Sequence, residues 1–326
     1  MNRTELNILS NFSNLNVQDK SLFLGSCFAE NIGKKFQSYH LNTSINPLGV
    51  VFHPIPLFGL LKRALDKNYF NEKDFFEYQD YWFNYELSGK CAKYERNESV
   101  DFANKKLREL DSELSSSSRL FLTFGSSILR KFESLPVANC HKQPLRDFEK
   151  EISSVSNMIE YLKPILKKIF QVNPSIKISL SVSPVRHTKE GMMENSLSKS
   201  NLIILCNQMA SQFKNVEYLP IYEVVIDELR DYSFFNNDLV HPNEKAIEIV
   251  WEKIKKGIGS KDFNRFCNQS QKLLNSFQHK TMYPKSKQNI LFLNNLLTAI
   301  IEHENNYDVN WHHEKKTIVD QLKSLA

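Results

Sequence analysis

The sequence lacks long apolar runs and an N-terminal leader pattern. No stretch reaches the roughly 18 apolar residues of a membrane span, and the closest, residues 290–301, is interrupted by Asn294 and Asn295. That stretch predicts an amphipathic helix. The first residues show no basic segment followed by an apolar one, so we expect no signal peptide and no membrane partner.

Cysteines are few and scattered. The five thiols lie far apart, are odd in number and form no C-x-x-C pair. This usage favours reduced thiols over a disulfide framework and predicts a cytoplasmic location. Cys140 and His141 suggest a Cys/His dyad or two metal ligands. Adjacent ligands are poorly spaced for zinc and no motif supplies a third, so we expect no metal site.

Concentrated charge is also missing. The net charge is only +5, and the lysines are spread along the chain without a basic arm. Nucleic-acid binding depends on clustered Lys and Arg, so we expect no nucleic-acid partner. Of the 326 residues, 41% are hydrophobic and 24% are charged. This composition and length are typical of a globular α/β protein with an appendage. The 23 phenylalanines predict an aromatic-rich core or binding surface.

Strand and helix patterns alternate over most of the chain. Strands are predicted at 21–25, 42–45, 119–125, 176–182 and 216–221, and helices at 27–36, 55–65, 101–114, 148–170, 200–213 and 243–256. This alternation predicts a mostly parallel, doubly wound sheet. The aromatic stretch 67–98 has no clear pattern, and a long loop is expected around 126–147.

The pattern changes after Gly259. Residues 262–326 contain no strand pattern and predict two or three helices. We therefore divide the chain into a domain at 1–258 and a helical C-terminal extension at 259–326. The extension could pack on the domain or pair two subunits into a homodimer.

Four polar groups fall at or just after predicted strand ends, where ligands of parallel sheets bind. Ser26 stands between a strand and a helix N-terminus, where free N–H groups and the helix dipole suit an oxyanion. A serine hydroxyl needs a base to take its proton. His241 could be that base, with Asp238 holding its tautomer. The amide of Asn139 and the N–H groups of Ser26 and Gly49 could then stabilise the anion.

Five ordered sequence blocks resemble the GSCFA family. They are LGSCFAEN at 24–31, NPLG at 46–49, VANCHK at 137–142, SPVRH at 183–187 and DLVHPN at 238–243. The resemblance covers about residues 20–258. That family is similar to the SGNH (GDSL-type) hydrolases. The resemblance implies a flavodoxin-like three-layer fold, an esterase-like or acyltransferase activity, and no metal or organic cofactor.

The resemblance also implies roles for single residues. Ser26 matches the nucleophile, Gly49 the oxyanion glycine, Asn139 the oxyanion asparagine, and Asp238 with His241 the D-x-x-H pair. Two features depart from typical SGNH enzymes. Gly-Ser-Cys replaces Gly-Asp-Ser, and Asn139 lies 14 residues past Gly125 instead of within a compact G-x-N-D.

Each of these residues also has a structural interpretation. Ser26 and His241 could cap helices, Gly49 could serve a turn, and Asn139 could bond its own loop. Cys27 is the rival nucleophile, although a cysteine in such a place is commonly a small buried apolar residue.

Further residues could contact a substrate. Arg186 and His187 follow a strand end and could bind an anionic or sugar-like group, or lie in a solvated loop. His53 could line the pocket or cap the helix that begins near Pro54. The aromatic residues at 75–85 could form a platform for a sugar or acyl group, with core packing as the alternative.

The sequence therefore predicts an enzyme for a small-molecule or carbohydrate ester, such as one carrying acetyl. Hydrolysis and acyl transfer share the same chemistry, and the sequence leaves both open. A non-catalytic carbohydrate-binding or scaffold protein on the same fold is the remaining alternative.

Overall fold

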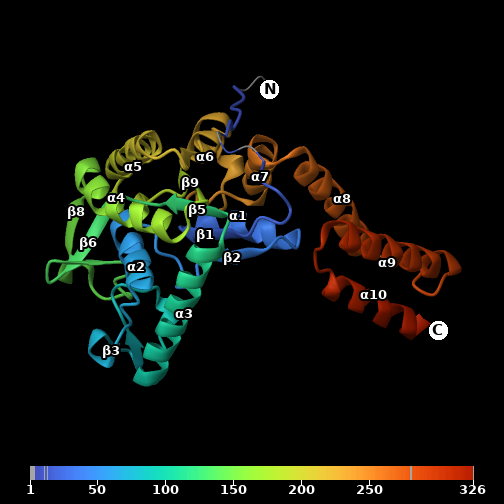
Figure 1. The fold of residues 1–326 in the computed structure, drawn as a ribbon, viewed down its shortest axis with the longest axis horizontal. Helices are drawn as coiled ribbons and strands as arrows, with labels where there is room; N and C mark the ends of the chain where they lie inside the picture. Colours follow the sequence, from blue (N-terminus) through green and yellow to red (C-terminus); the bar gives the residue numbers. More distant parts are fainter. Residues whose placement is uncertain (1–3, 11, 13, 280, 326) are drawn as a thin grey trace.

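A five-stranded parallel sheet forms the centre of the computed structural model, which describes residues 4–10, 12, 14–279 and 281–325 (Figure 1). Its strands, in spatial order, are β10 (Val216–Tyr218), β9 (Lys177–Val182), β5 (Arg119–Phe124), β1 (Ser21–Gly25) and β2 (Thr43–Ile45). All neighbouring pairs run parallel. Numbered along the chain, this order is the 2-1-3-4-5 order of flavodoxin-like folds. The predicted fold class is confirmed.

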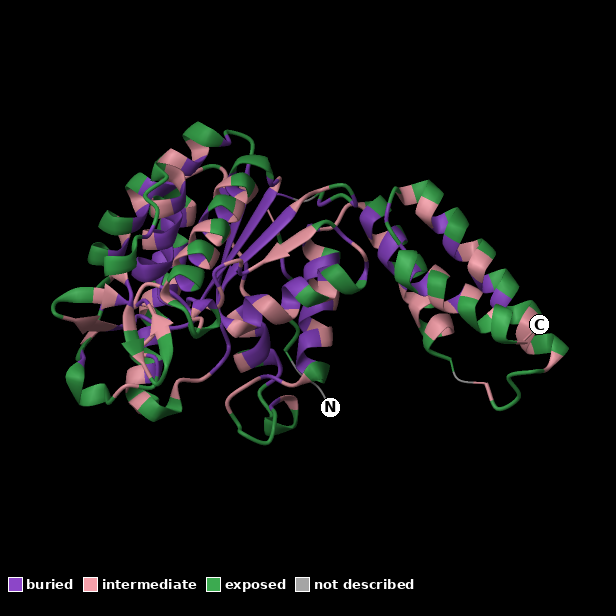
Figure 2. Ribbon diagram, turned by 90° about the horizontal axis from the view of Figure 1, so that it is seen from below, coloured by how far each residue is buried: buried purple, intermediate pink, exposed green. Residues whose placement is uncertain are grey.

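Both faces of the sheet are covered by helices (Figure 2). Alternate strand residues point to opposite faces. Leu22 and Leu24 of β1 pack in the layer with α2 (Pro54–Asp66), α3 (Arg96–Ser116), α4 (Val155–Val172) and α5 (Met192–Gln212). Phe23 packs in the other layer, with α1 (Cys27–Ser38) and α7 (Glu244–Ile258). Burial on both sides explains why these strands are continuous apolar runs.

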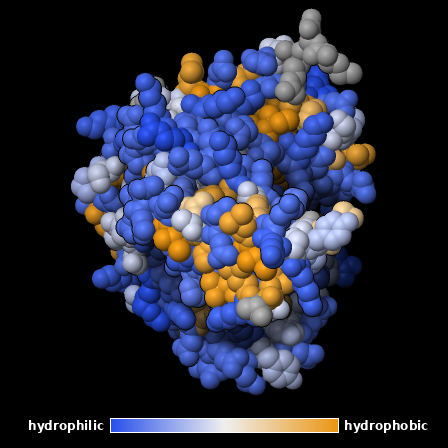
Figure 3. Space-filling view, turned by 90° about the vertical axis from the view of Figure 1, so that its right-hand side faces the viewer, coloured by the Kyte–Doolittle hydropathy of each residue, from blue (hydrophilic) through white to orange (hydrophobic). Residues whose placement is uncertain are grey.

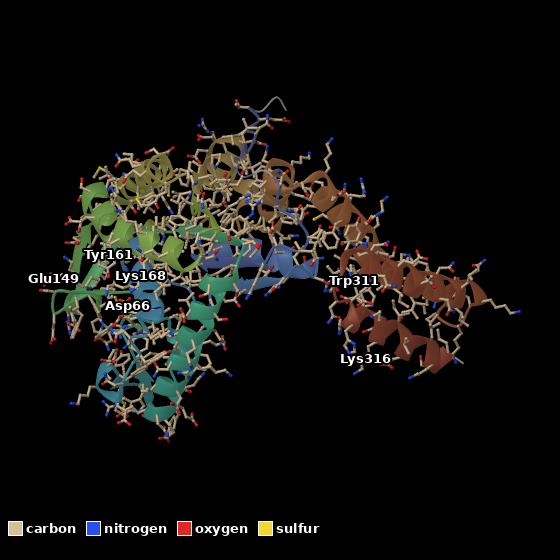
Figure 4. The ribbon with its side chains drawn as sticks, viewed as in Figure 1. Asp66, Glu149, Tyr161, Lys168, Trp311 and Lys316 are labelled. Atoms are coloured by element: carbon tan, nitrogen blue, oxygen red, sulfur yellow. The ribbon has the colours of Figure 1, made fainter. Side chains whose placement is uncertain are left out.

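The layer with α1 and α7 is aromatic, as the phenylalanine content predicts. Phe23 and Phe121 stack with ring centroids 4.5 Å apart, and Phe36 meets Trp251 edge-on at 5.1 Å. In the opposite layer, Asp66 of α2 and Lys168 of α4 form an ion pair at the surface (Figure 4). After β10 the chain forms a short helix, α6 (Ile221–Glu223), and a π-helical turn over Val224–Glu228.

Two small antiparallel sheets lie outside the main sheet, in segments that show no clear sequence pattern or were expected to form a loop. They consist of β3 (Phe76–Tyr78) with β4 (Tyr81–Phe83), and of β7 (Leu135–Val137), β6 (Ile128–Phe132) and β8 (Glu149–Ile152). Their hairpin turns place Gln79, Asp80, Glu133 and Ser134 at positive φ. Such turns usually carry Asn or Gly, so their sequences do not reveal them. The helix predicted at 148–170 begins only at Val155, because β8 precedes it.

Three helices follow the sheet domain: α8 (Lys261–Gln278), α9 (Lys287–Tyr307) and α10 (His312–Leu325). Phe263 of α8 joins the aromatic layer, with its ring 6.3 Å from that of Phe36. Buried Trp311, between α9 and α10, lies with its ring 4.3 Å from that of His40 (Figure 4). The extension thus packs on the domain, while the division at 258/259 stays a prediction.

Apolar side chains gather at the end of the molecule formed by the C-terminal helices (Figure 3). They include Phe277, Phe292, Leu296 and Ile318, which line a groove of about 740 Å³. A homodimer through these helices stays a prediction. Of the helices in the described residues, none is long and apolar enough to cross a membrane.

Candidate active site

Ser26 lies at the carboxyl edge of the central sheet, between β1 and α1. It occupies the N-cap position of α1, yet its side chain makes no capping hydrogen bond. The residue is only 3% exposed, and its Oγ has no hydrogen-bond partner among the described residues. Ser26 is thus the N-cap residue by position, but its side chain supplies no capping hydrogen bond. A buried polar group without a partner is costly and calls for an explanation.

The turn before Ser26 is held tightly against β5. Gly25 has φ +120°, and a Cβ there would lie 2.2 Å from the carbonyl oxygen of Thr123. That same oxygen accepts the N–H of Ser26 at 3.0 Å. The backbone N–H of Ser26, predicted to be free for an oxyanion, is thus already used.

Asp238 and His241 form a closely bonded pair. Asp238 Oδ1 accepts the N–H groups of Val240 at 2.9 Å and His241 at 3.0 Å, and its Oδ2 lies 2.7 Å from His241 Nδ1. These hydrogen bonds, first that of the His241 backbone, lower the pKa of Asp238 to about 2. An ionised carboxylate only accepts, so Nδ1 carries the proton and Nε2 is the basic nitrogen.

His241 does not cap the following helix. The side chain of Asn243 does so, because its Oδ1 accepts the N–H of Ala246 at 3.1 Å. The side chains of Asp238 and His241 are 49% and 43% exposed. A solvent-facing imidazole fixed by a carboxylate is suited to proton transfer.

The packing of α1 against α7 places Ser26 and His241 at the same edge of the sheet. Lys35 of α1 forms an ion pair with Glu248 of α7. Four residues later in the chain, directly after α1, the ring of Tyr39 lies 5.2 Å from that of Trp251, which is three residues after Glu248 in α7. The two helices therefore run in the same direction, and both begin at the carboxyl edge. Ser26 and His241 share no hydrogen bond in this arrangement, which is common for catalytic pairs without substrate.

The loop after β9 supports the loop that carries Asp238, Val240 and His241, called here the Asp238 loop. The backbone N–H of Arg186 donates to the carbonyl oxygen of Val240 at 3.2 Å, and its guanidinium lies 4.4 Å from the ring centre of Phe235. His187 packs with its ring 5.2 Å from that of Phe52. Burial first, and then the charge of Lys199, lower the pKa of His187 to about 4, so this imidazole is neutral. A direct contact of either residue with substrate stays a prediction.

His53 has a structural position. It is 4% exposed, its Nδ1 accepts the N–H of Ile55 at 3.1 Å, and its Nε2 lies 3.3 Å from Ser153 Oγ. Burial lowers its pKa to about 3. The capping alternative is confirmed, and both ring nitrogens face protein groups instead of a substrate.

Gly49 serves a turn in this structure. It has φ +79°, and its N–H donates to the carbonyl oxygen of Asn46 at 2.8 Å. A side chain there would also lie 2.5 Å from Ser88 Cβ. The turn alternative is confirmed, and the N–H predicted for the oxyanion is occupied.

Asn139 bonds its own loop. Its Oδ1 accepts the backbone N–H of His141 at 2.8 Å. The Nε2 atom of the His141 ring lies 2.8 Å from the carbonyl oxygen of Asn84. The rings of Phe83 and Tyr85 surround His141, with the Phe83 ring 4.6 Å away. This part of the 75–85 aromatic run packs internally. The loop-amide interpretation of Asn139 is confirmed, and its role at the oxyanion stays a prediction.

Comparison with known families identifies the chain. A model of the GSCFA family matches residues 20–254, well over half of the sequence. The chain belongs to the GSCFA family. A comparison with curated proteins finds no match.

A polar group on the buried face of α5 in this GSCFA protein is not among the residues predicted from the sequence. Lys199 is 1% exposed, and its ammonium donates to the carbonyl oxygens of Gly125 and Ser183, both at 2.6 Å. Ser198 accepts the N–H of Ser127 at 2.7 Å, and Asn195 accepts that of His187 at 2.9 Å. Asn195, Ser198 and Lys199 thus hold the ends of β5 and β9 together.

A signal for this group was present. Residues 195, 198 and 199 have the i, i+3, i+4 spacing of one helix face. The helix predicted at 200–213 excludes these residues, whereas α5 begins at Met192.

Cys27 is half-buried beside Ser26. Burial, and next the charge of Glu30, raise the pKa of its thiol, while Lys199 lowers it only as a minor contribution. The thiol therefore keeps its proton near neutral pH, which disfavours a thiolate nucleophile.

Replacing Lys199 by methionine is expected to change how stability depends on pH. Burial lowers the pKa of Lys199 from 10.5 to about 7, so between these values the unfolded chain binds more protons than the folded one. The free energy of unfolding of the wild type should therefore rise, relative to that of Lys199→Met, as the pH increases from about 7 toward 10. Urea unfolding of both proteins at pH 6.5, 8 and 9.5 measures this difference. A difference that stays constant over the series contradicts the prediction.

Proposed function

We propose that this GSCFA protein is a serine esterase of the SGNH kind, with Ser26 as nucleophile, His241 as general base and Asp238 as its orienting carboxylate. One observation carries the proposal. A carboxylate fixes the imidazole with Nε2 as its basic nitrogen, at the same sheet edge as a serine hydroxyl that has no hydrogen-bond partner among the described residues. The Ser26 side chain makes no capping bond and Asn243 caps α7 in place of His241, so helix capping does not account for these two side chains.

The proposed reaction has two steps. His241 Nε2 takes the proton of Ser26 Oγ, which attacks the ester carbonyl carbon and forms a tetrahedral oxyanion. The intermediate collapses to an acyl-serine as the leaving alcohol takes the proton from His241. A water, deprotonated in turn by His241, then attacks the acyl-serine. The bond between Ser26 Oγ and the acyl carbon breaks, Ser26 Oγ takes the proton from His241, and the acid is released.

Substrate binding has to rearrange the site locally. Ser26 Oγ is fully covered and does not reach His241, whereas His241 is partly exposed. The Asp238 loop is held to the rest of the site chiefly through the loop after β9, by Arg186 and Val240. We expect the ester to bring Ser26 and His241 into hydrogen-bond contact.

A groove beside the Asp238 loop supports a sugar-like alcohol group in the substrate. It has a volume of about 1100 Å³ and runs between α1 and α7, from Asn31 and Pro242 toward Tyr39. Most of its lining is polar, including Lys34, Asn236, Glu244 and Gln271. Such side chains can exchange hydrogen bonds with hydroxyl groups. An acetylated carbohydrate is the substrate class we propose.

Acyl transfer is the second candidate. In the second step an acceptor alcohol that binds in the polar groove would take the place of water. Product analysis with and without sugar acceptors separates the two: an acylated sugar indicates transfer, and free acid alone indicates hydrolysis.

A fluorophosphonate probe tests the proposal directly. We expect it to label Ser26 of the wild type, as found by mass spectrometry of the digested protein, and also of Cys27→Ala. Ser26→Ala should remain unlabelled. An unlabelled wild type that binds glycans saturably would instead support the scaffold alternative, and iodoacetamide inactivation that disappears in Cys27→Ala would support a cysteine nucleophile.

A further inference from the structure

Three backbone N–H groups near Ser26 are already used. The N–H of Gly25 donates to Asn46 Oδ1 at 2.9 Å, that of Ser26 to Thr123, and that of Gly49 to the carbonyl oxygen of Asn46. An oxyanion formed at Ser26 needs donors that are not engaged in the resting protein. Those three N–H groups therefore do not meet the requirement in this arrangement.

One side-chain donor beside Ser26 is free. Asn46 is 94% buried, since its exposed fraction is 6%, and its Nδ2 has no hydrogen-bond partner among the residues described. Most buried polar atoms in proteins are bonded, so an unpaired amide group beside an unpaired hydroxyl is unusual. A substrate oxygen bound between Asn46 Nδ2 and Ser26 Oγ would give each of these two atoms a hydrogen-bond partner.

The position of Asn46 is fixed by three contacts. It follows β2, whose Ile45 pairs with Phe23 of β1, and its N–H donates to the carbonyl oxygen of Phe23 at 2.9 Å. Its side-chain oxygen is bonded to Gly25, the residue directly before Ser26. Since Oδ1 faces Gly25, the amide plane is set and Nδ2 cannot turn toward that N–H. The backbone at Asn46 has φ +39°, a region that Asn and Asp tolerate better than other side chains.

We infer that Asn46 is a catalytic residue, whose Nδ2 donates a hydrogen bond to the oxyanion formed on attack by Ser26. This inference rests on the proposed function and assigns to Asn46 the amide role that the family resemblance implies for Asn139. The Oδ1 contact with Gly25 holds the amide in place before the reaction. Preorganised donors of this kind contribute mainly to kcat, because they bind the anion more strongly than the neutral ester.

Asn46→Asp separates this role from a structural one. Aspartate keeps an oxygen for the N–H of Gly25 and tolerates the same backbone conformation, but it has no N–H to donate. We expect kcat for p-nitrophenyl acetate to fall by about 10²–10³-fold, with KM changed by less than about fivefold.

Asn173→Asp is the matched control. Asn173 is 7% exposed, and its Nδ2 donates to the carbonyl oxygens of Leu114 and Ser117, at the opposite end of the strands. This variant should lose thermal stability and keep its kcat per folded molecule. Circular dichroism and thermal melting establish the folded fraction of each variant.

The outcomes distinguish the inference from the proposed function. If Asn46→Asp does not fold, Asn46→Ala takes its place and should show the same fall in kcat. A folded Asn46 variant within fivefold of the wild-type kcat overturns the inference, whatever Ser26→Ala shows. If Ser26→Ala itself retains full activity, both the proposed function and the inference about Asn46 are wrong.

Discussion

Ser26→Ala is expected to lower the turnover of p-nitrophenyl acetate by on the order of 10⁴-fold or more, the range found when a triad nucleophile is removed. The reason is chemical, since alanine has no oxygen to form the acyl intermediate. Because Ser26 Oγ bonds to nothing in the described chain, its loss should leave the melting temperature almost unchanged. Initial rates and thermal melts of the two proteins measure both effects.

Cys27→Ala is the control for this experiment. The thiol lies beside Ser26 and keeps its proton, so its removal should leave turnover within a few-fold of wild type. The reverse pattern, with Cys27→Ala inactive and Ser26→Ala active, would move the nucleophile to the cysteine.

Asp238→Asn is expected to reduce kcat/KM by about 10⁴-fold, as when an amide replaces the carboxylate of a triad. The amide nitrogen can then face His241 Nδ1, which favours the tautomer with its proton on Nε2. A protonated Nε2 cannot accept the proton of Ser26. The variant should recover part of its activity at high pH, where hydroxide can replace the missing base.

Asp231→Asn provides the comparison within the same segment. Asp231 also accepts a backbone N–H, from Ser233 at 2.7 Å, but it has no contact with an imidazole in the described structure. We expect this variant to retain most of the wild-type kcat/KM. Equal losses in both variants would indicate that the loop, and not the histidine tautomer, is affected.

The pKa of Asp238 sets a further expectation for pH. Its folded value of about 2 lies below the ordinary 3.8, so the carboxylate stabilises the loop above about pH 4 and loses this effect as the pH falls toward 2. A decline of activity between pH 5 and 7 is therefore to be assigned to another group.

The sequence determined features that depend on neighbouring residues. The buried runs of β1 and β5 and the helix periodicity after each of them fixed the parallel α/β arrangement. The sequence also predicted that Ser26 lies between a strand and a helix, and that Asp238 and His241 lie three residues apart within one loop. These features are local, because a strand, a helix turn or a three-residue loop is defined by contiguous residues.

Only the tertiary structure decided which polar groups are free. Gly49 and the Ser26 N–H were reasonable oxyanion donors until Asn46 and Thr123 proved to occupy them. Asn46 Nδ2 has no hydrogen-bond partner in the part of the chain that the structure describes, and Lys199 proved to be buried beneath the strand ends. The physical reason is that a donor is available only when no acceptor from a distant segment reaches it, and such contacts arise when strands and helices far apart in the chain pack together.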